Sequence, residues 1–207
     1  MSRITRIVLL TAIALFAAAP AASAVPSKKL DDYLAALWTT VLETPSAQNS
    51  FGTGGSAFAC FDLGGTVAPF APTGAESCTV KPGTKVFVAA SSVECSTFVR
   101  DDCGGTNEAK LRANARARDV QHAPTVTVDR RSVPVVEVET PLLNIVLPAD
   151  NVFGLPAGTQ GLSVAHGWVA LLHPLTPGTH TIVIVTAHPA PDPPTTITTT
   201  IVVKPGG

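Results

Sequence analysis

The sequence predicts a mainly β protein: an antiparallel β-sandwich or barrel with an N-terminal amphipathic helix and a second short helix. From residue 124 onward, apolar and polar residues alternate along short segments, which is typical of half-buried strands. Gly, Pro and Asn interrupt these segments at roughly ten-residue intervals, as turns do in antiparallel sheets. Charged residues make up only 14% of the chain, so Thr, Ser, Gly and Pro must cover much of its surface, which suits an extracellular β protein.

The first 24 residues have the composition of a secretory signal peptide. Arg3 and Arg6 precede an apolar run at residues 7–19, and a small-x-small cleavage motif ends at Ala24. The run is too short to remain as a membrane anchor, because a bilayer core needs about 20 apolar residues in a helix. We therefore expect cleavage after Ala24, which leaves residues 25–207 as a single secreted domain without a membrane span.

The charge of the exported chain excludes one class of partner. Loss of Arg3 and Arg6 with the leader makes the formal net charge of −1 more negative by two charges. A weakly acidic chain lacks the basic surface that attracts nucleic acid. The partners that remain are a polymer of the cell envelope or an extracellular protein, and we expect no cofactor.

Four cysteines, Cys60, Cys78, Cys95 and Cys103, lie in the first half of the exported chain. An even number in an exported protein predicts two disulfides, and four cysteines allow three pairings. We favour the sequential pairing, Cys60 with Cys78 and Cys95 with Cys103, because the turn-like residues 101–105 fold the chain back toward Cys95. A four-cysteine zinc site would need close Cys-x-x-Cys pairs, which this chain does not have.

The segment Ser27–Glu43 is predicted as the amphipathic helix. Ser27 can cap its first turn, and Pro45 ends it because the residue before a proline avoids the helical conformation. Its apolar residues recur every three or four positions, as on a helix face that packs against a core. They are Leu30, Tyr33, Leu34, Leu37, Trp38, Val41 and Leu42.

The middle of the chain is expected to alternate loops and strands before the second helix. We predict loops at residues 46–55 and 69–77 and strands at residues 57–63 and 84–90. Residues 106–120 form the second helix candidate, with a thin apolar face. Its basic residues are interpreted as a solvated face that could touch anionic envelope polymers: Lys110, Arg112, Arg116 and Arg118.

Residues 124–203 are predicted to be rich in strands. Alternation is clearest at Thr125–Val128 and Val136–Glu139, with residues 129–132 as a hairpin turn between them. Residues 174–178 are interpreted as the turn of a second hairpin. Further strands are expected at residues 142–147, 162–165, 168–172, 179–187 and Thr195–Val203.

Three segments of the exported chain occur together in a recognisable order: Cys-Thr-Val-Lys-Pro-Gly-Thr-Lys-Val-Phe at 78–87, Val-Thr-Val-Asp at 126–129, and the histidine-containing segment 166–182. In this order they resemble a group of uncharacterised exported bacterial proteins that is common in actinobacteria. The resemblance implies an immunoglobulin-like (Ig-like) β-sandwich with an N-terminal helix, and it supplies no catalytic residues. The chain departs from the group's pattern at two positions, with Arg130 in place of a glycine and His166 in place of an aspartate.

Four histidines, His166, His173, His180 and His188, are the candidate metal ligands. Across a hairpin at residues 174–178, His173 and His180 would face each other and could bind zinc or copper, with His166 or His188 as a third ligand. We favour the alternative that these histidines flank turns or lie on the surface, because odd spacing within a strand places residues on opposite faces.

No residue is assigned a catalytic role. A serine-hydrolase elbow is missing, because no glycine stands two residues after Ser56. Glu137 and Glu139 share one face of a strand, and we interpret them as solvent-facing rather than as a catalytic pair. We therefore expect a secreted, non-enzymatic domain that binds a ligand at the cell envelope or outside the cell. The alternative is an extracellular zinc- or copper-dependent enzyme that uses the four histidines.

Overall fold

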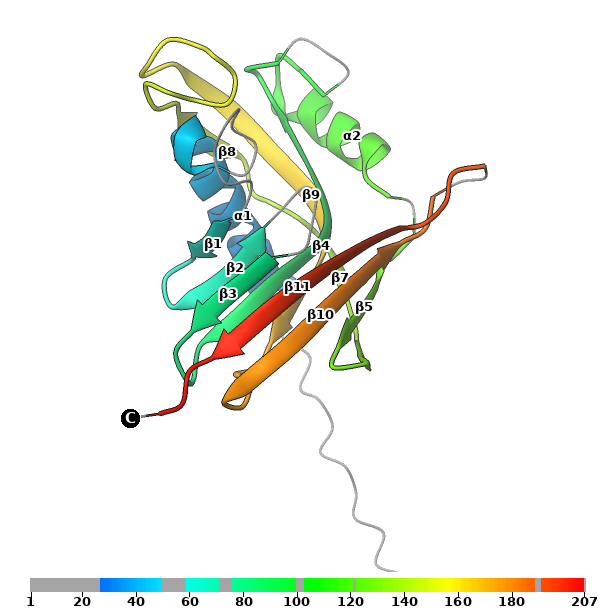
Figure 1. The fold of residues 1–207 in the computed structure, drawn as a ribbon. Helices are drawn as coiled ribbons and strands as arrows, with labels where there is room; N and C mark the ends of the chain where they lie inside the picture. The colour runs from blue at the N-terminus through cyan, green and yellow to red at the C-terminus, as the bar shows by residue number, and fades with distance from the viewer. Residues whose placement is uncertain are drawn as a thin grey trace, which may run out of the picture.

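The computed structural model of the protein describes residues 27–49, 59–70, 76–99, 103–120, 122–188 and 191–206, and the predicted leader lies outside them. Within these ranges the chain has two α-helices and eleven strands, which form two sheets (Figure 1). The protein is therefore mainly β, as predicted. No helix in the described part of the chain has the length and apolar character needed to cross a membrane.

The first sheet, sheet A, contains the two longest strands of the fold. Its strands run in the order β1 (Ala59–Asp62), β2 (Thr66–Phe70), β4 (Lys85–Ser96), β9 (Gln160–Leu172) and β7 (Val136–Glu139), and β8 (Leu143–Val146) also pairs with β9. Neighbouring strands are antiparallel except for β2 and β4, which are parallel.

The second sheet, sheet B, carries the C-terminal strands. Its order is β3 (Glu76–Val80), β11 (Thr195–Val203), β10 (Gly178–Thr186), β5 (Thr125–Val128) and β6 (Arg131–Val133). Here β3 and β11 are parallel and the other pairs are antiparallel. Both sheets are therefore mixed, and the prediction of a purely antiparallel arrangement is wrong at these two pairs.

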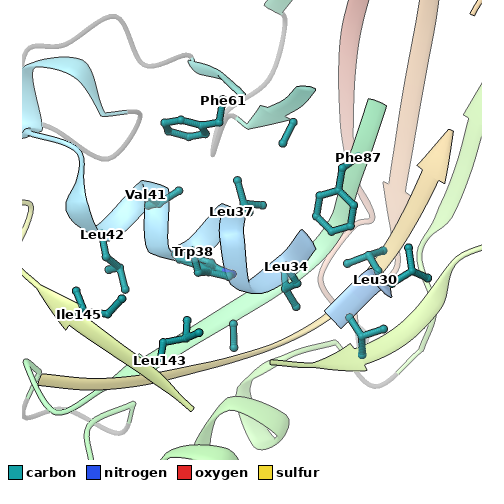
Figure 2. Close-up of a cluster of buried hydrophobic side chains, with 14 of the residues drawn as sticks. Leu30, Leu34, Leu37, Trp38, Val41, Leu42, Phe61, Phe87, Leu143 and Ile145 are labelled. Atoms are coloured by element: carbon teal, nitrogen blue, oxygen red, sulfur yellow. The ribbon is translucent and has the colours of Figure 1, made fainter. Parts of the chain in front are cut away.

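Helix α1 (Ser27–Glu43) packs against one face of sheet A and begins and ends at the predicted residues (Figure 1). Figure 2 shows its apolar side chains facing Phe87, Leu143 and Ile145 of the sheet. This apolar layer removes a large hydrophobic area from water, which is the main favourable contribution to folding. The buried residues that α1 contributes are Leu30, Leu34, Leu37, Trp38, Val41 and Leu42.

The opposite face of sheet A is shared by sheet B and helix α2 (Glu108–Arg118), so that α1 and α2 lie on opposite sides of β4 and β9 (Figure 1). Along β9, Ala170 packs with residues of sheet B, whereas Val164 packs with residues of α2. His166 alternates onto this same face between the two clusters, because residues two apart on a strand share a face. The fold therefore places His166 where the cover of sheet A changes from sheet B to α2.

Two disulfides join these layers, and both have the pairing favoured by the sequence. Cys60 on β1 is bonded to Cys78 on β3, which links sheet A to sheet B. Cys95 on β4 is bonded to Cys103, which ties the segment that enters α2 to sheet A. Crosslinks of this kind stabilise a small domain by about 2 to 4 kcal/mol each.

The structure corrects two local predictions. Residues 69–77 were expected as a loop but contain parts of β2 and β3. Pro69 is tolerated in β2 because it pairs only with β1, where Cys60 is its partner. The segments 162–165 and 168–172 were expected as separate strands but belong to one strand, β9, which runs through Gly167 without a break.

The predicted hairpin at residues 174–178 is wrong in a way that matters for function. The strand before it, β9, belongs to sheet A, and the strand after it, β10, belongs to sheet B. The bend therefore crosses from one sheet to the other instead of joining two paired strands. By contrast, the turn at Asp129 and Arg130, which have positive φ angles of 49° and 68°, does join two paired strands. It joins β5 to β6 and not to β7 as predicted, because β7 belongs to sheet A.

Candidate binding pocket beside helix α2

Helix α2 has clear capping signals but little apolar surface. The side chain of Asn107 caps its start by accepting a hydrogen bond from the backbone N–H of Lys110 at 3.0 Å. Its last turn is followed by Asp119, whose backbone is extended. Leu111 and Ala115 are the buried residues that α2 contributes. Polar contacts must therefore supply much of what fixes the helix on the sheet.

Two arginines of α2 hold one carboxylate of β7. Arg112 Nη1 and Arg116 Nε each lie 2.6 Å from an oxygen of Glu139, one oxygen for each arginine. Arg112 also donates to Glu108 at 2.6 Å and to the carbonyl oxygen of Thr140 at 2.8 Å. The prediction of a solvated basic face is therefore wrong for Arg112, whose side chain is 23% exposed, whereas Arg116 pairs with Glu139 and is still 63% exposed.

His166 lies at the centre of the cluster, between two carboxylates. Its Nδ1 is 2.8 Å from Asp119 Oδ2, and its Nε2 is 3.1 Å from Glu137 Oε1. The side chains of His166 and Asp119 are 8% and 0% exposed, whereas that of Glu137 is 55% exposed. Since a carboxylate accepts at both ring nitrogens, we assign a proton to each of them.

The surroundings of His166 favour its charged form. The hydrogen bond to Asp119 is the main cause that raises the pKa of His166, and the negative charges of Asp119 and Glu137 add to it; burial opposes them. The ring also lies beside the C-terminal end of α2, where the helix dipole favours a positive charge. The neighbours of His166 therefore stabilise the charged form of this buried side chain.

Asp119 is fixed from below by sheet A. Its Oδ1 accepts hydrogen bonds from the hydroxyl of Ser91 at 2.6 Å and from the backbone N–H of Val120 at 2.8 Å. The register of β4 against β9 shifts between Ala89 and Ser91, as at a β-bulge. A bulge redirects side chains, and here it turns Ser91 toward α2. The Ser91 hydroxyl therefore positions Asp119, and Asp119 in turn positions His166.

A pocket of about 440 Å³ opens above this cluster, between α2 and β7. We call it the α2 pocket; its lining residues are Arg116, Val120, Glu137, Val138, Glu139 and His166. The two Nη nitrogens of Arg116 have no partner among the described residues, since its contact with Glu139 uses Nε. Likewise, Glu137 contacts His166 through Oε1, and its Oε2 has no partner in the described part of the chain. The pocket thus presents unused donors on one wall and an unused acceptor on the other.

The four histidines predicted as possible metal ligands do not come together. His166 lies in the α2 pocket, whereas His180 bonds Asp129 at 2.7 Å and His188 bonds Thr195 at 2.8 Å. His173 is exposed in the bend that follows β9. Among the described residues, no group of three or more His, Cys, Asp or Glu side chains is placed to hold a metal ion. The metal site was the alternative interpretation, and it assumed the hairpin at residues 174–178, which the structure does not have. The favoured interpretation, of turn-flanking or surface histidines, does not hold for His166, which is buried.

Sequence reasoning found part of this pocket. Glu137 and Glu139 were predicted to share a solvent-facing strand face, and they do share a face; Glu137 is 55% exposed, but Glu139 lies beneath α2 and is 17% exposed. It missed Asp119 and Ser91, which have no motif around them. One usable signal was present: two arginines four residues apart share one face of a helix, at 112 and 116, and the strand predicted at Val136–Glu139 carries acids on one face that could pair with them.

The comparisons with known proteins add no assignment. No protein-family model matches the chain, and no curated protein matches it with significant similarity. Among solved structures, the solution structure of Amebosin aligns with 11% sequence identity and a TM-score of 0.27, over 67% of this chain and 96% of that chain. A similarity this weak says nothing about fold or function.

Proposed function

We propose that this protein is an exported, non-enzymatic binding domain and that the α2 pocket is its ligand site. One observation carries the proposal: the pocket holds charged groups that are fixed by neighbours and still have unused hydrogen-bonding capacity. Arg116 is fixed through Nε and keeps its Nη donors, and Glu137 is fixed through Oε1 and keeps Oε2. Binding sites gain affinity when polar groups are held in place before the ligand arrives.

Binding is favoured over catalysis by the way His166 is engaged. A general base needs a free ring nitrogen, but both nitrogens of His166 contact carboxylates. A nucleophile would have to contact that histidine, and the nearby Ser91 hydroxyl donates to Asp119 instead. The cluster therefore holds charges in place rather than activating an attacking group.

Export and an Ig-like β-sandwich are part of the same proposal. The leader-like residues 1–24 and the two disulfides support export, because disulfides persist in oxidising compartments. A core cluster with residues of both sheets, from Val86 of β4 to Ile201 of β11, supports a sandwich. The ligand would then be met at the cell envelope or outside the cell.

Export is tested by the intact mass of protein recovered from culture medium. We expect a chain that begins at residue 25 and carries no free thiol. A chain that retains the leader, or one with four free thiols, would contradict this part of the proposal.

The binding role is tested by NMR on ¹⁵N-labelled protein with three probes at millimolar concentration: the dipeptide Ala-Ala, the disaccharide trehalose and succinate. We expect at least one probe to shift the amide signals of Val120 and Val138, which line the pocket, more than that of Lys110 on the exposed side of α2. The double variant Arg116→Ala, Glu137→Ala should lose this response while remaining folded. If no probe shifts the two pocket signals in the wild-type protein, the pocket is not a ligand site.

A further inference from the structure

We propose that the ligand of the α2 pocket is a small zwitterion with one ammonium group and one carboxylate, of the size of an amino acid or dipeptide. This inference rests on the proposed function and specifies the class of ligand. The carboxylate pairs with Arg116 and the ammonium group pairs with Glu137.

The hydrogen-bonding capacity of the arginines leaves room for one carboxylate. Arg112 is committed to Glu108, to Glu139 and to the carbonyl oxygen of Thr140. Arg116 uses only Nε, on Glu139 Oε2, so its two Nη groups remain as a donor pair in the described part of the chain. A guanidinium with two parallel N–H groups matches the two oxygens of a carboxylate.

The hydrogen-bonding capacity of the two glutamates leaves one carboxylate oxygen for an ammonium group. Both oxygens of Glu139 are occupied, one by Arg112 and the other by Arg116. Glu137 is 55% exposed and keeps Oε2 available among the described contacts. An ammonium group entering the pocket therefore has one carboxylate to bind, and His166 holds that carboxylate in place.

The net charge of the lining favours a ligand that is itself neutral. Two positive groups, Arg116 and His166, stand among two negative groups, Glu137 and Glu139. A pure anion would bring its charge close to the two glutamates, and a pure cation would bring its charge close to Arg116 and His166. A zwitterion satisfies Arg116 and Glu137 together and leaves the charge of the pocket balanced.

The size and walls of the pocket agree with a ligand of this kind. Its volume of about 440 Å³ lies in the usual range for small-molecule sites, roughly 300 to 1,000 Å³. Val120 adds apolar surface between the charged walls, whereas the side chain of Val138 packs into the apolar cluster with α1 on the opposite face of sheet A. That surface suits a short aliphatic side chain better than a second charge.

The test compares Ala-Ala with two matched probes that each lack one charge: N-acetyl-Ala-Ala, without the ammonium group, and Ala-Ala-amide, without the carboxylate. Affinities are measured from the shifts of the Arg116 Nε–H signal and of the Val120 and Val138 amides. We expect Ala-Ala to bind at least about tenfold more tightly than either blocked probe, as one charge-assisted hydrogen bond implies. Equal affinities for the three probes would overturn the zwitterion assignment.

Two variants identify the residue that binds each charged group of Ala-Ala. Glu137→Gln should lower the affinity for Ala-Ala to that of the acetylated probe and leave binding of the acetylated probe unchanged. Arg116→Gln should lower the affinity for Ala-Ala to that of Ala-Ala-amide and leave binding of Ala-Ala-amide unchanged. Lys110→Gln, on the exposed side of α2, is the control and should change neither affinity. A thermal unfolding curve for each variant confirms that it is folded.

The outcomes separate this inference from the proposed function. If trehalose shifts the pocket signals and Ala-Ala does not, the pocket binds ligands but the zwitterion class is wrong. If neither Ala-Ala nor trehalose nor succinate shifts them, both proposals fall. If Ala-Ala binds and Glu137→Gln and Arg116→Gln both leave its affinity unchanged, the zwitterion binds elsewhere and the assignment to this pocket is wrong.

Discussion

The two faces of sheet A are covered by helices of opposite character. On one face, α1 buries six apolar side chains, among them Leu34 and Leu37, which have no exposed surface. On the other face, α2 buries Leu111 and Ala115 and depends on contacts among arginines, acids and a histidine. The same sheet therefore carries an apolar interface with α1 on one side, and on the other an apolar interface with sheet B beside a charged one under α2.

This difference separates stability from ligand recognition. Apolar burial stabilises the fold strongly but does not select a particular ligand, because its free energy is roughly proportional to the buried area and has no direction. Charged contacts contribute less net free energy, but they fix the positions of groups that a ligand can use. We infer that α1 stabilises the fold and that α2 completes the pocket.

The largest effect is expected on the α1 face. Leu37→Ala should lower the free energy of unfolding by about 3 to 4 kcal/mol, because it removes buried methyl groups and leaves a cavity. Urea unfolding measures the change, with Lys29→Ala on the exposed side of α1 as the control. The pocket signal of Val120 should stay in place. A loss below about 1 kcal/mol would show that Leu37 is not tightly packed between α1 and sheet A.

A smaller loss is expected at the base of the pocket. Asp119→Asn keeps the volume but removes the negative charge that faces the buried His166. We expect about 2 kcal/mol of destabilisation, because a buried charge then lacks its main partner. Denaturant unfolding at neutral pH gives the value, and Asp32→Asn on an exposed position of α1 is the control. Wild-type stability in Asp119→Asn would mean that the pair does not hold α2.

The contacts of Arg112 and Arg116 with Glu139 should matter less for the stability of the fold than for the affinity of the pocket. Glu139→Gln replaces the carboxylate that binds two guanidinium groups with a neutral amide. We expect the free energy of unfolding to fall by about 1 kcal/mol. Because Arg116 is no longer fixed, the affinity for Ala-Ala should also fall. Calorimetric titration measures that affinity. An unchanged affinity for Ala-Ala would show that Arg116 is fixed in some other way.

The smallest effect concerns the pH dependence of stability. The pKa of His166 is raised in the folded protein, so its protonation contributes stability that is fully present below the ordinary histidine pKa of about 6.5. That contribution is lost as the pH rises through the raised pKa. The slope of stability against pH in this window should therefore be negative in the wild-type protein and closer to zero in His166→Gln. Identical slopes would contradict a charged His166.

The sequence was most informative where one residue type repeats with a fixed period. Apolar spacing located α1 at both ends, and alternation located β5, β7 and β11 at their observed bounds. Proximity of cysteines along the chain favoured the observed disulfides. These features depend on local spacing, which a single sequence contains.

The pocket depends on contacts between distant segments, which local spacing does not specify. Asp119 and His166 are 47 residues apart, and they meet only because α2 crosses β9. The bulge that turns Ser91 toward Asp119 has no marked residue pattern. The alternative of a histidine metal site also assumed a contact between segments that the fold does not make, since the bend after β9 leads to the other sheet.

The pH titration of the His166 ring nitrogens by NMR tests the organisation of the pocket most directly. The structure predicts a ring with a proton on both nitrogens at neutral pH and a pKa above the ordinary value, because of its hydrogen bond to Asp119. Asp119→Asn should then lower that pKa. A neutral His166 at pH 7 in the wild-type protein, or the same pKa in both proteins, would contradict the arrangement on which the binding site depends.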